Sequence, residues 1–320
     1  MSDSINNINW YPGHMSKAKR QMTEELKLVD IIIELVDARI PYSSKNPDIN
    51  RMAEGKPRIL LLNKADLADD NRSREFKEYY EKQGYRVILM NSKERAKMQV
   101  VMKEVLKACE KKRERDAKKG MVARPLRAMI VGIPNVGKST FINAFVGKNV
   151  AAVGNKPGVT KGKQWIRINK DLELLDTPGI LWPKFEDKRV GRNIAFIGSI
   201  NGDILDNTEL TKLLLAALLR DYPGILGKRY SVSEAATAED MLAVIAQKRA
   251  CMKKGGELDL DRAALQIIDD FRSGKLGKIT LERPTKEDVL NAIKSRENEN
   301  VPNNPAKDEK DTQANLPTEE

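Results

Sequence analysis

A phosphate-binding loop carries the most specific chemistry in the chain. The segment GIPNVGKS at Gly132 to Ser139 matches the pattern G-x-x-x-x-G-K-S. Its glycines let backbone amides turn inward around phosphate oxygens, and the following helix N-terminus adds partial positive charge. A glycine-rich turn without nucleotide is the alternative, but this loop follows an apolar run and opens a helical pattern. The residues that we expect to contact nucleotide here are Asn135, Val136, Gly137, Lys138, Ser139 and Thr140.

Two side chains of this loop have expected roles in the chemistry itself. Lys138 reaches the β- and γ-phosphates, and the Ser139 hydroxyl can ligate Mg²⁺. Downstream, Asp176 ends another apolar run in the sequence DTPG, where a carboxylate could hold a magnesium-bound water. The Gly179 amide of that segment could contact the γ-phosphate. DTPG alone could be a simple turn, but its place after the phosphate loop indicates a nucleotide-sensing switch.

A second motif predicts which base is bound. The sequence NKAD at Asn63 to Asp66 follows a strand pattern. An ionised Asp66 only accepts hydrogen bonds, and guanine presents N–H donors at N1 and N2, whereas adenine has an acceptor at N1. With adenine, the Asp66 carboxylate would face an acceptor and lack a hydrogen-bond donor, so ATP binding should be strongly disfavoured. We expect Asn63 to bridge the base edge or neighbouring loops, the stem of Lys64 to cover the ring, and Asn91 and Ser92 of a later NSK sequence to support the base.

The order of these motifs is unusual. In an ordinary GTPase the phosphate loop comes first and the base-reading sequence last, whereas here residues 63–66 precede residues 132–139. The sequence therefore predicts a circularly permuted arrangement. Because the DTPG strand then ends the nucleotide domain, we hypothesise that switch movement could reorient the segment that follows it.

The elements that must position these motifs alternate between strands and helices. Short aliphatic runs end in polar loops, as expected of strands in a parallel sheet covered on both faces, with ligands at the carboxyl ends. The sequence thus predicts an α/β fold, a circularly permuted P-loop GTPase domain followed by a small all-α domain. The expected domains are 1–184, 185–290 and a disordered tail at 291–320. The runs start at Asp30, Pro57, Arg86, Leu126 and Leu172, and the later helical patterns cover 208–220, 238–253 and 261–273.

The charge of the chain points to a polyanionic partner. The 320 residues carry a formal charge of +11, and the acidic stretch 296–320 contributes -4, which leaves +15 on the remainder. Residues 93–119 hold eleven Lys or Arg against five Asp or Glu, with apolar residues at helical spacing. This segment is either a binding surface or only a solvated amphipathic helix.

Several classes of protein are disfavoured by the composition. The N-terminus lacks a basic and apolar leader, and no run approaches the roughly 20 apolar residues of a membrane span. We therefore expect a soluble cytoplasmic protein without stable membrane association. Cys109 and Cys251 lie far apart without a histidine cluster, so neither a disulfide framework nor a zinc site is indicated.

Taken together, these motifs resemble those of the circularly permuted GTPases of the ribosome biogenesis GTPase A family. The resemblance covers most of residues 8–285. It implies GTP hydrolysis coupled to late assembly of the large ribosomal subunit, turnover raised by the precursor particle, and a C-terminal helical domain that binds ribosomal RNA. Besides NKAD and the phosphate loop, it rests on WYPGHM at 10–15, LVDARIP at 35–41, PGVT at 157–160 and LLDTPGILWPKFED at 174–187.

The resemblance also supplies candidates for catalysis. Many GTPases place a water-orienting glutamine just after the switch glycine, but Ile180 stands there and cannot orient water. The family points instead to His14, although WYPGH could be only a packing and turn motif. It assigns Asn135 to K⁺ coordination, with a loop-stabilising amide as the alternative, and Thr160 to contact with Mg²⁺ and the γ-phosphate.

Two other functions stay open at this point. One is a GTP-gated RNA-binding scaffold whose slow hydrolysis only resets binding. The other is a membrane-associated or transport GTPase, against which the lack of apolar anchors argues.

Overall fold

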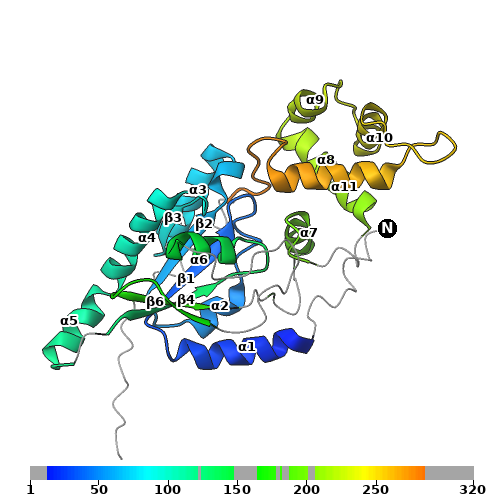
Figure 1. Cartoon of the computed structure of the whole chain (residues 1–320). Coiled ribbons are helices and arrows are strands. Elements are labelled where there is room, and N and C mark those ends of the chain that lie inside the picture. Colours follow the sequence, from blue (N-terminus) through cyan, green and yellow to red (C-terminus); the bar gives the residue numbers. More distant parts are fainter. Residues whose placement is uncertain are drawn as a thin grey trace, which may run out of the picture. The chain divides into compact units, whose positions relative to one another are not determined.

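The sheet that carries the predicted motifs has six strands. The computed structural model describes residues 13–121, 124–147, 164–177, 181, 187–200 and 206–284, with only the backbone given for 13–19, 95 and 164. The strands lie in the order β3-β2-β1-β4-β6-β5 (Figure 1). They are β1 (Ile31–Asp37), β2 (Arg58–Asn63), β3 (Arg86–Leu89), β4 (Leu126–Val131), β5 (Gln164–Arg167) and β6 (Leu172–Asp176).

Five of the six strands are the aliphatic runs that the sequence predicts. All seven residues of β1 are buried, because this central strand is covered on both faces. It pairs in parallel with β2 on one side and β4 on the other. The sixth strand, β5, was not predicted from the sequence. It pairs antiparallel with β6 at the edge of the sheet, so the sheet is mixed rather than wholly parallel.

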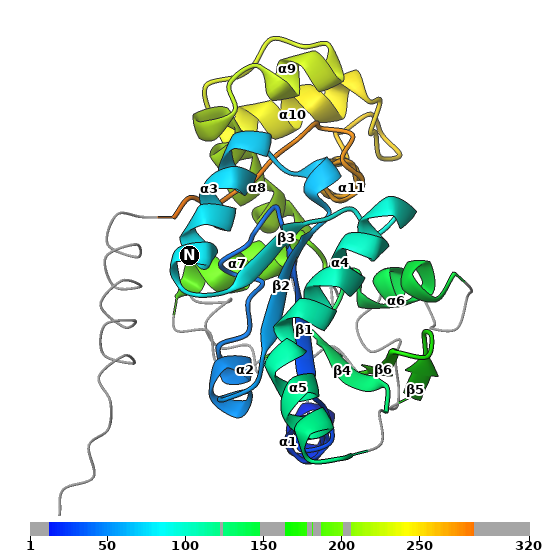
Figure 2. The same ribbon diagram turned by 90° about the vertical axis from the view of Figure 1, so that its left-hand side faces the viewer.

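Helices cover both faces of the sheet. One face packs against α4 (Arg95–Ala108) and α6 (Lys138–Val146), through side chains such as Val101 and Phe141, and Figure 2 shows α4 lying across the strands. The other face packs against α1 (Gly13–Leu26) and α2 (Pro47–Met52), through Met22, Leu26 and Ile49. Next to β3 lies α3 (Asp70–Lys82). The sheet is thereby held rigidly enough to present loops at its carboxyl edge.

The basic segment 93–119 is helical, as its spacing predicts, but it forms two helices. Val101 and Val105 on α4, and Cys109 directly after it, are fully buried. The chain continues as α5 (Glu110–Lys118), which has no buried residue among its nine. The segment is therefore anchored at its first half and exposed along its second.

The residues that the structure describes between 187 and 273 are mainly helical. Their helices share one hydrophobic core with the α4 face of the sheet, which includes Phe196, Leu214, Ile245 and Ile267. Two short helices, α7 and α9, were not predicted, and α10 ends at Lys248 rather than Lys253. The helices are α7 (Lys188–Phe196), α8 (Asn207–Asp221), α9 (Ile225–Tyr230), α10 (Ala238–Lys248) and α11 (Leu260–Ser273).

The structure does not test the predicted domain boundaries or the predicted tail. The boundaries at 184 and 290 remain predictions, and the expected disordered tail lies outside the described residues. Both cysteines are buried free thiols. Among the helices described, none is both long and apolar enough to cross a membrane.

Candidate functional site

The site lies where the strand order of the sheet reverses. From β1 the chain proceeds outward through β2 to β3, whereas β4 starts again on the opposite side of β1. In open α/β sheets a ligand crevice forms at such a point, beyond the carboxyl ends of the strands. The phosphate loop follows β4 and the base-reading sequence NKAD begins at the end of β2. Parallel pairing through β1 brings both motifs to the same edge.

The phosphate loop depends on its two glycines for close approach to neighbouring strands. Gly132 has φ +151° and Gly137 has φ +98°. A Cβ on Gly132 would lie 2.5 Å from the carbonyl oxygen of Leu35, and one on Gly137 would collide with the amide nitrogen of Asn63. Any side chain at either position would push the loop away from β1 or from the base-reading sequence.

Lys138 is buried at the start of α6 and is held by the loop's own backbone. Its ammonium donates to the carbonyl oxygens of Gly132 at 3.1 Å and Ile133 at 2.9 Å. Burial lowers the pKa of Lys138 to about 8, against the opposing effect of Asp176. No described carboxylate forms an ion pair with this buried ammonium, and a phosphate group would supply the anionic partner.

The oxygens around the loop fit Mg²⁺. Asp176 is buried at the end of β6, and its Oδ1 has no hydrogen-bond partner among the described residues. Burial raises the pKa of the Asp176 carboxyl, and Lys138 partly offsets this effect. Ser139 presents a half-buried hydroxyl in the first turn of α6. A hard cation prefers such oxygen ligands, so Ser139 and Asp176 are the described residues that would hold it.

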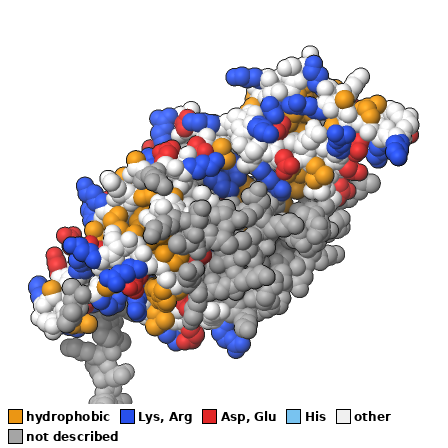
Figure 3. Space-filling model, in the orientation of Figure 1, with side chains coloured by type: hydrophobic (Ala, Val, Ile, Leu, Met, Phe, Trp, Pro, Cys, Tyr) orange, Lys and Arg blue, Asp and Glu red, His pale blue; other side chains and the backbone are white. Residues whose placement is uncertain are grey.

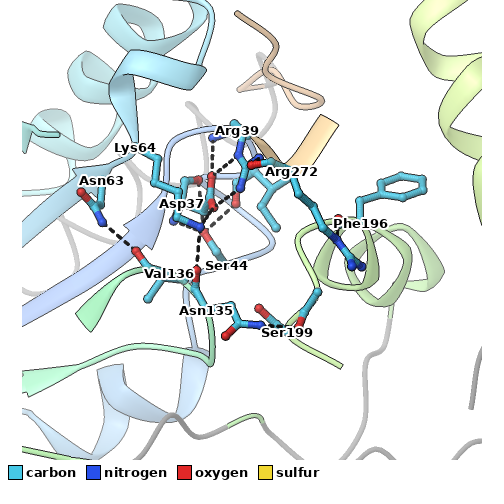
Figure 4. Close-up of polar contacts among 12 residues, drawn as sticks. Asp37, Arg39, Ser44, Asn63, Lys64, Asn135, Val136, Phe196, Ser199 and Arg272 are labelled. Carbon is cyan, nitrogen blue, oxygen red and sulfur yellow. Dashed lines mark hydrogen bonds and ion pairs between the residues drawn. The ribbon is translucent and has the colours of Figure 1, made fainter. Parts of the chain in front are cut away.

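The amide of Asn63 joins three loops of the site. Its Nδ2 donates to the carbonyl oxygen of Val136 at 2.7 Å (Figure 4). Its Oδ1 accepts from the backbone N–H of Ser92 at 3.1 Å and from the Ser92 hydroxyl at 2.7 Å. The neighbouring Asn91 closes its own turn by accepting from the N–H of Lys93 at 3.0 Å. The NKAD, phosphate and NSK loops are thus fixed relative to one another by one buried side chain.

Lys64 and Asp66 have different surroundings within NKAD. Lys64 adopts a left-handed backbone conformation with φ +58°, and its ammonium donates to the carbonyl oxygen of Asn135 at 2.6 Å. Asp66 is exposed in the short 3₁₀ turn η1 (Ala65–Leu67) and makes no hydrogen bond or ion pair with any described residue. Its carboxylate is therefore able to accept from a base.

A buried ion cluster at the end of β1 was missed by sequence reasoning. Asp37 is fully buried and accepts from Arg39 through both oxygens, at 2.9 Å from Nε and 2.8 Å from Nη2. The Lys64 ammonium lies 3.0 Å from the same carboxylate. Burial raises the pKa of Asp37, but the two cations outweigh it and hold the pKa well below its usual range. The available clue was position, since Asp37 ends the strand at the point of reversal.

The turn after α7 also contacts the phosphate loop. The Ser199 hydroxyl donates to the carbonyl oxygen of Pro134 at 2.5 Å. Asn135 has φ +60°, and its side-chain amide donates to the carbonyl oxygen of Gly198. Sequence reasoning singled out Asn135 but gave no sign of these partners, which come from the helical part of the chain.

The remaining predicted site residues are placed only in part. Val136 is fully buried, and Thr140 is half-buried in the first turn of α6. The backbone of His14 belongs to α1, but its side chain is not described. Thr160 and Gly179 lie outside the described residues.

The fold and this site together define a circularly permuted P-loop GTPase. A family profile described as 50S ribosome-binding GTPase matches residues 127–215, from β4 into α8. The chain is 45% identical over 284 residues to ribosome biogenesis GTPase A of Bacillus cereus, which covers 87% of this chain and 94% of the relative. It is 35% identical over 279 residues to the protein of that name from Thermotoga maritima, which covers 87% and 95%. The chain belongs to the ribosome biogenesis GTPase A family and is a GTP-hydrolysing enzyme.

Solved structures agree with this assignment. The chain superposes on a GDP-bound structure of TM YlqF with a TM-score of 0.60 at 28% identity, covering 83% of this chain and 99% of that one. It superposes on GNP-bound YlqF from T. maritima with a TM-score of 0.59 at 29% identity, covering 84% and 98%.

Removing the Asn63 amide should loosen the whole site. We expect Asn63→Ala to lower the free energy of unfolding by about 1–3 kcal/mol, because buried groups lose their partner, and to weaken GDP binding by about tenfold or more. Chemical denaturation and nucleotide titration measure the two effects. Asn169→Ala is the matched control, since its Oδ1 accepts from the N–H groups of Asp171 and Leu172 in the turn between β5 and β6, outside the predicted site. Equal losses in both variants would contradict the role given to Asn63.

Nucleotide binding should be linked to protonation of Lys138. Below pH 8 this lysine is already charged in the free protein, whereas above pH 8 it is mostly neutral and must take up a proton when phosphates bind. We expect little uptake at pH 7, about half a proton per GDP at pH 8, and falling affinity from pH 8 to 9. Calorimetry in buffers of different ionisation enthalpy measures the uptake.

Lys64 needs a control because burial lowers its pKa as well. Lys64→Arg keeps a charge that does not titrate in this range. The proton uptake should persist in this variant. Uptake that is the same at pH 7 and pH 9 would rule out a titrating Lys138.

Proposed function

We propose that this chain hydrolyses GTP during late maturation of the large ribosomal subunit, and that the precursor particle raises its turnover. The assignment rests on its relatives, which are named ribosome biogenesis GTPase A, and on the 50S ribosome-binding profile. The observation that carries the coupling is the contact of Gly198 and Ser199 with the phosphate loop. Through it, a particle bound to the helical part of the chain has a direct route to the γ-phosphate site. Ribosome assembly would place the protein in the cytoplasm.

Three residues are proposed to act on the γ-phosphate. His14 orients the attacking water from the N-terminal segment, since Ile180 stands where other GTPases use glutamine. Thr160 contacts Mg²⁺ and the γ-phosphate, and Asn135 helps to bind K⁺, which offsets developing phosphate charge as an arginine finger does. The support for His14 is that α1, which carries it, is anchored beneath the sheet by Met22 and Leu26.

Ribosomal RNA is proposed to bind a basic hairpin that follows α10. Residues 251–259, here called the basic hairpin, close through a bridge between Met252 and Leu258 and a hydrogen bond from the Lys253 N–H to the Glu257 carbonyl at 2.8 Å. Lys and Arg side chains gather at this end of the helical region (Figure 3). Four exposed cations, none of which forms an ion pair with a described residue, lie in and before it: Lys248, Arg249, Lys253 and Lys254. A preordered set of unpaired cations suits a phosphate backbone.

The helices α4 and α5 are the competing surface. Lys107 and Lys111 are exposed there and lack ion pairs with described residues. Lys103 and Lys118 are likewise exposed without an ion pair to a described residue. Two other cations of α5 are compensated, since Lys112 pairs with Asp116 at 2.8 Å and Arg113 lies 3.7 Å from Asp171. The hairpin surface is the denser of the two along the chain, because its four unpaired cations fall within residues 248–254, whereas those of α4 and α5 are spread over residues 103–118.

GTP turnover should respond to the large subunit. In potassium buffer we expect purified large subunits to raise turnover by at least about tenfold, the effect of about 1.4 kcal/mol of added transition-state stabilisation. Small subunits are the control and should have no effect. Phosphate release under multiple-turnover conditions is the measurement. Tight GTP-dependent binding without stimulation would instead favour the RNA-binding scaffold.

Two changes to the same assay test the proposed catalytic groups. His14→Ala should abolish stimulation while GDP affinity survives, and replacing K⁺ by Na⁺ should lower the stimulated rate. Unchanged turnover in His14→Ala would remove this residue from catalysis, and equal rates in the two salts would remove K⁺.

The two basic surfaces should differ in the salt dependence of binding. We expect the double variant Lys253→Gln and Lys254→Gln to reduce the slope of log affinity against log salt by about 1.5, because each phosphate contact contributes about 0.7–0.9. Filter binding to large-subunit ribosomal RNA between low and moderate salt provides the slopes. Lys107→Gln with Lys111→Gln is the matched pair on the other surface. A larger change in that pair would move the RNA site to α4 and α5.

A further inference from the structure

The chain returns from α11 to the guanine-reading loop. Residues 274–282, here called the return segment, follow α11 and appear in orange in Figure 1. The N–H of Ile279 donates to the carbonyl oxygen of Leu67 at 3.0 Å, directly after the sequence NKAD. The Thr280 hydroxyl donates to the carbonyl oxygen of Ala38 and accepts from the N–H of Asp69, both at 3.1 Å. The return segment is thus bound to both flanks of the base-reading site.

Gly274 lets the return segment approach Leu67 closely. It begins the segment in a left-handed conformation with φ +80°. A Cβ at this position would lie 2.5 Å from Cδ2 of Leu67. A side chain at this position forces a shift of the Leu67 side chain, of the return segment, or of both. Leu67 ends the η1 turn that presents Asp66, and its carbonyl oxygen is held by Ile279, so a shift of the return segment reaches the carboxylate that reads guanine.

The carboxyl end of α11 is fastened to the same site from the other side. Arg39 donates from Nη1 to the carbonyl oxygens of Phe271 at 3.1 Å and Arg272 at 3.2 Å. The same guanidinium binds Asp37, and Asp37 in turn holds Lys64 (Figure 4). A continuous polar path therefore runs from the last turn of α11 to a residue of NKAD.

Arg272 extends this path to the phosphate loop. Its guanidinium donates to the carbonyl oxygens of Phe196 at 2.8 Å and Ala195 at 3.0 Å, at the end of α7. The next turn, with Gly198 and Ser199, binds the phosphate loop. The last turn of α11 is consequently linked to both nucleotide-binding loops.

We propose that the carboxyl end of α11 and the return segment position the guanine-reading loop, so that selection of guanine depends on the helical part of the chain. On its inner side the loop is fixed by the N–H of Ala65, which donates to the carbonyl oxygen of Met90 at 3.0 Å. On its outer side Ile279 and Gly274 hold Leu67. Gly274, Ile279 and Thr280 are positioning residues, since they act on the base through Leu67 and its neighbours.

A consequence follows for any partner of the helical region. Coupling between two binding sites is reciprocal, so a partner that shifts the end of α11 must change guanine-nucleotide affinity by the factor with which nucleotide changes the partner's affinity. The inference concerns base recognition and holds whether or not that partner is a ribosomal particle.

Comparison of two glycine variants tests the proposal. We expect Gly274→Ala to weaken GDP binding by about tenfold but inosine diphosphate binding by only about threefold, because both nucleotides lose the contact at N1–H and only GDP also loses the contact to the exocyclic amino group. Gly224→Ala is the matched control, with φ +86° and nothing within 4 Å of the added Cβ. It has similar backbone strain in the helical region, and both affinities should stay within about twofold of the unchanged protein.

The ratio of GDP affinity to inosine diphosphate affinity distinguishes a positioning role from a general loss of the folded site. A Gly274→Ala protein that loses both affinities equally, or neither, would overturn the proposal. So would Gly224→Ala if it lowered the ratio to the same extent. Thr280→Val removes one hydroxyl at nearly constant volume and provides the decision if Gly274→Ala does not fold. Thr280→Val should lower the ratio of GDP affinity to inosine diphosphate affinity by about threefold. An unchanged ratio would overturn the proposal.

Discussion

The burial of the Asp37 carboxylate between two cations is the interaction on which the site depends. An isolated buried carboxylate is unfavourable, and removal of Asp37 would leave two cations without their shared anionic partner. Arg39 and Lys64 both bind it, but each also reaches outward, Arg39 to the carbonyl oxygens of α11 and Lys64 to that of Asn135. One carboxylate thus fixes the orientation of two long side chains that connect three parts of the chain.

The phosphate site has the opposite electrostatic character. Among the described residues, the buried Lys138 ammonium has only carbonyl partners, and the buried Oδ1 of Asp176 has no hydrogen bond. These groups destabilise the free protein, as the lowered pKa of Lys138 and the raised pKa of Asp176 indicate. Phosphate and a magnesium-bound water would satisfy them, so binding and stability are linked. The base-reading side is therefore pre-formed, while the phosphate side is completed by its ligand.

The sequence predicted the parts of the site that follow local rules. Five strands were predicted from aliphatic runs, and the phosphate and base-reading loops from residue spacing and the end of a strand. The edge strand β5 was missed because its sequence QWIR has only two apolar residues, Trp165 and Ile166, and so shows no aliphatic run. Arg39 and Arg272 were missed for a different reason. Their partners lie 232 and 76 residues away, at Phe271 and Phe196, and no local pattern reports contacts of such sequence separation.

Circular permutation accounts for the importance of these distant contacts. In this order the base-reading strand β2 comes early, and the switch strand β6 ends the sheet, so the chain leaves the nucleotide domain beside the phosphates. The helical part that follows contacts the phosphate loop through Gly198 and Ser199, and it contacts the base-reading loop through residues 274–282. A segment attached at both ends of the ligand is sensitive to the distance between base and phosphate sites, which a domain joined by one linker is not. The permuted order therefore places the helical region where it can respond to the nucleotide as a whole.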